Sequence, residues 1–124
     1  MRNLALLALL TLASPAWASL DRLPVTQTSP TDFTVGYKGG ASIYNYWCAA
    51  GRFVTATLRL PEGTRVYRQS PSPRQSGQGI SFTLDPAKSV GDTGVSTFGG
   101  PQDGSFTASG AQQDFCNSRR PSGG

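Results

Sequence analysis

The sequence predicts an α+β fold in which one helix packs on a small antiparallel β-sheet and is stapled by one disulfide. Three observations lead to this class: helical apolar spacing between Ile43 and Leu60, alternating apolar residues on either side of that stretch, and two cysteines in a chain that begins like an exported protein. The alternative is an all-β sandwich, because the stretch from Ile43 to Leu60 can also be divided into two strands.

Residues 1–18 have the pattern of a secretory signal peptide. A basic start at Arg2 is followed by an apolar run from Leu4 to Ala13, and the small residues Ala16 and Ala18 mark a cleavage site. The apolar run is roughly half the length needed to span a bilayer. We therefore expect an exported protein, periplasmic or secreted, that is cleaved after Ala18 and does not span a membrane.

The remaining chain has the length of one domain. We expect an extended lead-in over residues 19–30, a single small globular domain with a glycine-rich C-terminal part over residues 31–118, and a disordered tail over residues 119–124. A chain of this size buries roughly 60–70% of its unfolded surface, which is enough for one modest core.

Cys48 and Cys116 are the only two cysteines, and an exported chain favours a disulfide between them. Such a bond closes a loop of about 68 residues, for which chain entropy gives roughly 4 kcal/mol of stabilisation. A zinc site needs three or four ligands, and the chain has no histidine. We therefore expect a structural disulfide, no metal site and no cofactor.

The first strand is predicted from Asp32 to Tyr37, where Phe33 and Val35 alternate with polar or small residues. A pair of glycines follows and ends the strand. This alternation predicts one buried face and one solvent-facing side.

A helix is predicted from Ser42 to about Leu58. Apolar residues recur there at spacings of three and four from Ile43 to Leu58, and Ser42 follows the glycine pair as a suitable N-cap. The competing interpretation is the strand-like alternation that runs from Val54 to Leu60, and one glycine and two threonines weaken the helix.

Two further strands are predicted at Arg65 to Gln69 and at Ile80 to Leu84, with Ser81 and Thr83 facing outward. The intervening Ser70 to Gly79 segment, SPSPRQSGQG, is rich in turn-forming residues. We expect an antiparallel hairpin with this segment as its long loop.

The glycine-rich part carries two weaker strand patterns, Val95 to Phe98 and Ser105 to Ala108. A flexible tail held only near Cys116 is the alternative for this region.

Enzymatic motifs are missing from the sequence. Without histidine, the commonest general base is absent, and no nucleophile elbow, P-loop or dinucleotide fingerprint occurs. The seven acidic residues are scattered, and most adjoin glycine or proline, as in turns. We predict that the protein is not an enzyme, with a carboxylate-based hydrolase as the alternative.

Arginines form the most distinctive pattern. Five of them fall between residues 52 and 74 with only Glu62 opposing them: Arg52, Arg59, Arg65, Arg68 and Arg74. Arg52 and Arg59 are seven residues apart and would share one helix face. Arginine recognises oxyanions in a bidentate manner, so these five residues are the candidate binding surface. An ordinary solvated surface is the simpler interpretation.

The tripeptide Tyr46 to Cys48, with the distant Cys116, resembles small periplasmic lysozyme inhibitors of the membrane-bound or C-type class. The Ser-Gly-x-x-Tyr element of that family is missing here, and a net charge of +4 opposes binding to a basic lysozyme. We therefore assign no family and transfer no site residues from it.

The sequence predicts a small, basic, exported interaction module without nucleic-acid partners. Its partner would be an unknown protein or an anionic component of the cell envelope. The first alternative is an inhibitor that inserts the Ser70–Gly79 loop into the cleft of an envelope or extracellular enzyme. The hydrolase is the second alternative.

Overall fold

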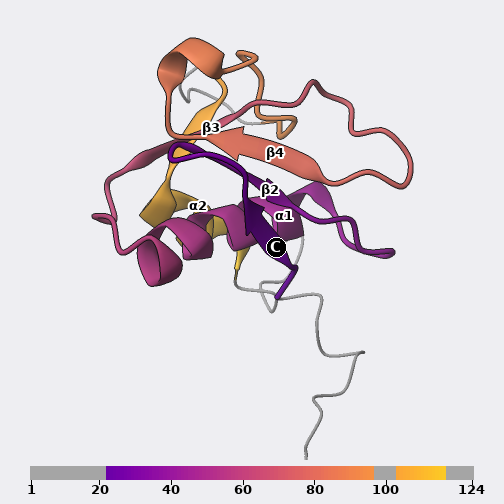
Figure 1. Cartoon of the computed structure of the whole chain (residues 1–124). Helices are drawn as coiled ribbons and strands as arrows, with labels where there is room; N and C mark the ends of the chain where they lie inside the picture. The colour runs from indigo at the N-terminus through magenta and orange to yellow at the C-terminus, as the bar shows by residue number, and fades with distance from the viewer. Residues whose placement is uncertain (1–21, 97–102, 117–124) are drawn as a thin grey trace, which may run out of the picture.

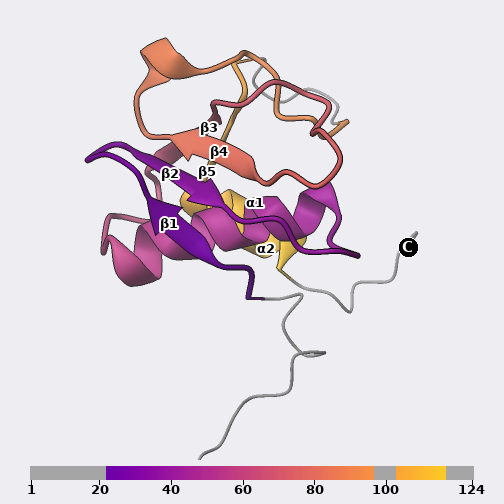
Figure 2. The same ribbon diagram turned by 45° about the vertical axis from the view of Figure 1, so that its right-hand side comes forward.

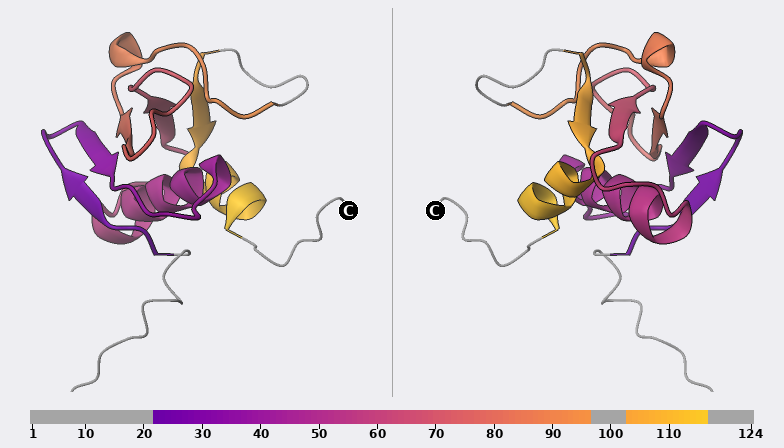
Figure 3. Two further views of the ribbon diagram at one scale, coloured as in Figure 1. Left: turned by 90° about the vertical axis from the view of Figure 1, so that its right-hand side faces the viewer. Right: turned by 90° about the vertical axis from the view of Figure 1, so that its left-hand side faces the viewer.

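The structure is a computed structural model in which residues 22–96 and 103–116 are described. An antiparallel five-stranded sheet curves over two helices that lie side by side against it (Figures 1 and 3). The strand order is β1-β2-β4-β3-β5. The strands are β1 (Val25–Gln27), β2 (Asp32–Val35), β3 (Arg65–Arg68), β4 (Ile80–Thr83) and β5 (Ser105–Thr107). The helices are α1 (Ile43–Arg52), the π-helical η2 (Phe53–Thr57), the 3-10 helix η3 (Pro86–Lys88) and α2 (Ala108–Phe115).

The predicted α+β class and its disulfide are confirmed. The predicted signal peptide over residues 1–18 and the predicted tail over residues 119–124 lie outside the described residues. In the described part of the chain, no helix is both long and apolar enough to cross a bilayer.

The helix predicted from Ser42 forms as α1 and continues into η2. The backbone N–H of Ser42 donates to Asn45 Oδ1 at 2.8 Å, which closes the start of the helix as a capping box does. Tyr46 and Trp47 lie on the face that is fully buried against the sheet. The segment is therefore helical, as the spacing of its apolar residues predicts, and the strand-like alternation after Val54 does not form a strand. The helix is favoured because the large apolar side chains share one buried face.

The predicted hairpin of β3 and β4 is confirmed, with Arg68 opposite Phe82 and Tyr67 opposite Thr83. Thr83 was predicted to face outward, which implies exposure to solvent. That exposure is wrong, because this residue is fully buried. The chain after β4 folds back over it, and Lys88 Nζ reaches Asp32 at 2.9 Å. The outer face of the central strand is therefore covered by this returning segment.

The secondary structure differs from the sequence prediction in three segments. The lead-in contributes strand β1, which pairs with β2, for example Val25 with Val35. The predicted strand ending at Ala108 forms only as β5, because Thr107 Oγ1 accepts from Gly110 N and starts α2. In the predicted strand from Val95 to Phe98, the two described residues are not in a strand.

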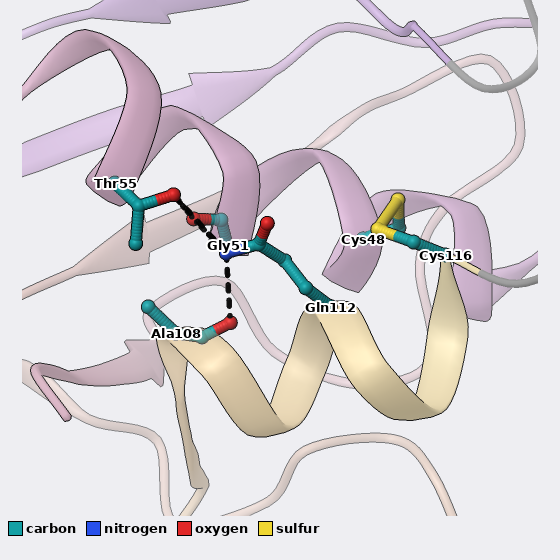
Figure 4. Close-up of a disulfide and its surroundings, with 6 residues drawn as sticks. All are labelled: Cys48, Gly51, Thr55, Ala108, Gln112 and Cys116. Atoms are coloured by element: carbon teal, nitrogen blue, oxygen red, sulfur yellow. Dashed lines mark hydrogen bonds between the residues drawn. A yellow bond between two sulfur atoms is a disulfide. The ribbon is translucent and has the colours of Figure 1, made fainter. Parts of the chain in front are cut away.

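The Cys48–Cys116 disulfide joins α1 to the end of α2 (Figure 4). The two helices approach closely at Gly51, where an added Cβ would lie 2.7 Å from the carbonyl oxygen of Ala108. Gln112 Nε2 donates to the Gly51 carbonyl at 3.2 Å, at the junction between α1 and η2. A disulfide, a glycine contact and a side-chain hydrogen bond thus hold α2 on α1.

Trp47 occupies the centre of the core. Its ring makes edge contacts with Phe82 of β4 and Phe106 of β5, each with 4.8 Å between ring centroids. Its Nε1 donates to the carbonyl oxygen of Thr93 at 3.0 Å, so the indole is both packed and hydrogen-bonded. This bond anchors the segment after η3 to the helix layer.

Candidate functional site

The five arginines predicted as one binding surface are distributed over different elements. Arg52 lies in the last turn of α1. Arg59 lies beyond η2 with a left-handed φ of 58°, so the predicted shared helix face is wrong because the helix ends first. Arg65 of β3 donates from Nε to Ser105 Oγ at 3.0 Å. Arg68 and Arg74 are brought together, since both line one cavity.

Arg68 is not a surface residue, contrary to the sequence prediction, because only 1% of it is exposed. Its Nε donates to the Ser70 carbonyl at 2.8 Å and its Nη2 to the Pro71 carbonyl at 3.0 Å. Its Nη1 donates to the Thr93 carbonyl at 3.2 Å, the same oxygen that Trp47 binds. The buried guanidinium therefore ties the start of the Ser70–Gly79 loop to the segment around Thr93.

Burial is the largest influence on the Arg68 guanidinium and lowers its pKa from the ordinary value. The negative charge of Asp92 opposes this shift, and the positive charge of Arg74 adds to it. Arginine nevertheless stays protonated under all ordinary conditions. A full positive charge is therefore held inside the fold.

Arg74 is half-buried beneath its own loop. Its Nη1 donates to the carbonyls of Gln75 and Gln78, at 3.0 Å each. Its guanidinium carbon lies 5.4 Å from the ring centroids of both Tyr37 and Tyr46, in cation–π contact. Tyr46 is fully buried, whereas 48% of Tyr37 is exposed. Arg74 thus joins two carbonyl groups of the loop and connects the loop to an exposed aromatic ring.

The Ser70–Gly79 loop is anchored at both of its ends. At the first end, Ser70 Oγ accepts from the backbone N–H of Ser81 at 3.0 Å. At the other end, Gly79 leaves no room for a side chain, because an added Cβ would collide with the carbonyl oxygen of Val35. Between these anchors most of the loop is exposed. Figure 2 shows the loop standing beside the start of α1.

We use the name loop face for the surface made by Tyr37, Arg74 and the exposed part of the Ser70–Gly79 loop. Tyr37 was not among the predicted site residues, and an exposed tyrosine before a glycine pair carries no sequence signal of its own. The alternation of a strand could have predicted that Arg68 is buried. Arg68 is two residues after the buried Val66, so the two side chains lie on the same side of the strand.

Four of the acidic residues make hydrogen bonds that support the fold. Thr83 Oγ1 and Lys88 Nζ donate to the buried carboxylate of Asp32 at 2.6 and 2.9 Å, and these bonds hold its pKa well below the ordinary value despite burial. Three other carboxylates each accept from the backbone N–H two residues later, as in Asx turns: Asp85, Asp92 and Asp103. Among the described residues, no group of three or more histidine, cysteine or acidic side chains is placed to hold a metal ion.

A separate hollow of about 400 Å³ lies between the start of the described chain and α1. Two arginines, Arg22 and Arg52, line it together with apolar residues that include Leu23 and Phe53. Its lining begins at Arg22, the first described residue, so we assign no site to it.

Comparison with known proteins found no matching family model, no matching curated protein and no matching solved structure.

Proposed function

We propose that this protein is an exported interaction module that binds a partner protein through its loop face. The observation that supports this proposal is the construction of the Ser70–Gly79 loop, which is exposed along most of its length and is held by the buried Arg68 and the half-buried Arg74. The disulfide between Cys48 and Cys116 is consistent with export.

A loop held in one conformation is suited to binding, because less conformational entropy is lost when the partner arrives. Each rotamer-rich side chain that is already ordered saves about 0.5–1.5 kcal/mol of binding free energy. Tyrosine and arginine are also the residue types that most often dominate interface energies. On the loop face, Tyr37 supplies an exposed ring and Arg74 supplies the adjacent cation.

The loop favours an inhibitor as the particular form of this module. The exposed positions Pro71 and Pro73 alternate with half-buried Ser72 and Arg74, so one edge of the loop faces solvent while the other is supported by the fold. Inhibitors that enter a cleft as rigid loops bind with little change of backbone shape. A basic surface formed by all five arginines is not proposed, because Arg68 is buried.

Affinity capture followed by a binding measurement tests the proposal. The chain, produced with its disulfide intact, is immobilised and exposed to cell-envelope extract at physiological salt. Proteins retained are purified and titrated against the free chain by calorimetry. We expect one protein to bind with a stoichiometry of one, and to bind at least tenfold more weakly to the Tyr37→Ala and Arg74→Gln variants.

The matched control is Arg59→Gln, which removes the same charge from an exposed residue outside the loop face. The control should bind like the unmodified chain. Equal weakening by Arg59→Gln and Arg74→Gln would contradict the loop face and indicate general charge attraction. If the captured protein is an enzyme, loss of its activity at equimolar ratio supports the inhibitor form.

A further inference from the structure

A small cavity lies directly beneath the loop face. It has a volume of about 290 Å³ and is bounded by the start of α1 on one side and by the Ser70–Gly79 loop on the other. Ser42 and Ile43 line it from the helix, and Ser72, Arg68 and Arg74 line it from the hairpin. Two guanidinium groups therefore line one cavity that is partly open to solvent.

The charge of Arg68 has no carboxylate partner within the described part of the chain. The ion pair there joins Lys88 to Asp32, and Arg68 instead donates to three backbone carbonyls. A guanidinium has five N–H groups, so one N–H on Nη1 and one on Nη2 are left without an acceptor among the described residues. A buried charge is normally paired, because removing it from water is costly.

Further donors at the cavity also lack acceptors. Arg74 uses only Nη1 for its hydrogen bonds, so its Nε and Nη2 have no acceptor among the residues that the structure describes. In the same ranges, no hydrogen bond involves the hydroxyl of Ser72, which lies near Arg68 beside Gly94. The first turn of α1, beginning at Ile43, adds the positive end of a helix dipole.

The charges around the cavity favour a single negative charge. Arg68 and Arg74 contribute two positive charges, and Asp92, whose charge acts on Arg68, offsets one of them. Water occupies about 30 Å³ per molecule, so a space of about 290 Å³ admits a carboxylate with a few waters.

We propose that this cavity binds one carboxylate group, held by the unused N–H groups of Arg68 and Arg74 and by the hydroxyl of Ser72. The expected source is an acidic side chain of the partner protein, and this assignment of the source rests on the proposed function. A free small carboxylate has the same chemistry and is the other source.

Titration followed by NMR tests the site. Sodium acetate is added to the ¹⁵N-labelled chain at constant ionic strength, with sodium chloride as the reference anion. We expect saturable shifts of the Arg68 and Arg74 Nε–H signals and of the Ile43 amide signal, with dissociation in the millimolar range. Arg74→Gln should weaken binding about tenfold, Ser72→Ala severalfold, and Arg59→Gln not at all.

A second titration distinguishes the two sources. It uses a Gly-Asp-Gly peptide blocked at both ends, so that its only carboxylate is the aspartate side chain. Saturable shifts with both probes support a partner's acidic side chain, whereas shifts with acetate alone assign the site to free carboxylates. Linear shifts with both probes, equal to those with chloride or unchanged in Arg74→Gln, would overturn the site.

The amide spectrum of each variant establishes that it is folded before its titration is interpreted. Because no partner protein takes part, these titrations can fail while the capture experiment succeeds. The converse is equally possible, so the site and the proposed function are tested separately.

Discussion

Replacing Gly51 by alanine tests how α2 is held against α1. The new Cβ would lie 2.7 Å from the Ala108 carbonyl oxygen and 3.2 Å from both Ala111 Cβ and Gln112 Cγ. In a helix with an open face the same substitution stabilises by about 1 kcal/mol, because glycine is a poor helix former. At Gly51 the helices must separate, since the nearest atom belongs to the backbone of α2.

The magnitude follows from three contributions. Overpacking costs about 1–3 kcal/mol, and weakening the hydrogen bond from Gln112 to the Gly51 carbonyl costs about 1 kcal/mol more. The gain in helix propensity offsets about 1 kcal/mol of this loss. We therefore expect Gly51→Ala to lower the free energy of unfolding by about 1–3 kcal/mol, and each kcal/mol lowers Tm by about 4–8 °C.

Urea denaturation with the disulfide intact, followed by fluorescence of the buried Trp47, measures this loss. The matched control is Gly63→Ala, at a turn glycine where an added Cβ meets nothing within 4 Å. The control should change the midpoint little. A Gly51→Ala midpoint equal to or above that of the unmodified chain would refute the close packing of the two helices.

Three further predictions concern the elements that hold the sheet and the loop. Asp32→Asn should lower the free energy of unfolding by about 1–3 kcal/mol at neutral pH, because the buried Thr83 hydroxyl and the partly exposed Lys88 ammonium lose their charged acceptor. The pKa of Asp32 is lowered in the folded protein. The stabilisation that its carboxylate provides is therefore present above the ordinary pKa of about 3.9 and is lost as the pH falls below that value. Urea midpoints measured from pH 2 to 6 should consequently fall less steeply toward acid pH in Asp32→Asn than in the unmodified chain. Replacing Cys48 and Cys116 together by serine should cost roughly 4 kcal/mol, measured as a fall in Tm, and an unchanged Tm would contradict a structural disulfide. Arg68→Met should remove three hydrogen bonds to carbonyls, and hydrogen exchange of the Ser70–Gly79 amides should then be at least tenfold faster, whereas unchanged protection would mean that the loop is held by other contacts.

The local elements were largely predictable. The helix from Ser42 and the strands that became β2, β3 and β4 each carry a periodicity that one buried face imposes on neighbouring residues. Helix α2 was not predictable in this way. Its sequence, ASGAQQDF, has little apolar content and two poor helix formers, and it is held by Thr107 at its start, by Gly51 at its side and by the disulfide at its end.

The candidate site was only partly predictable. The sequence indicated the Ser70–Gly79 loop and the arginines near it, but it treated the five arginines as equivalent. The structure separates them, because Arg68 lies beneath the loop while Arg59 is exposed beyond the end of η2. Linear spacing does not report which carbonyls converge on a guanidinium, since Ser70, Pro71 and Thr93 come from two segments.

The amino-acid sequence by itself determined the fold class, the central helix and hairpin, and the pairing of Cys48 with Cys116, since periodicity and a single pair of cysteines leave few alternatives. Only the tertiary structure decided that β1 joins the sheet, that α2 packs on α1, and that Arg68 and Arg74 face a common cavity. These features depend on contacts between residues that are distant along the chain. No local pattern of residues specifies such contacts.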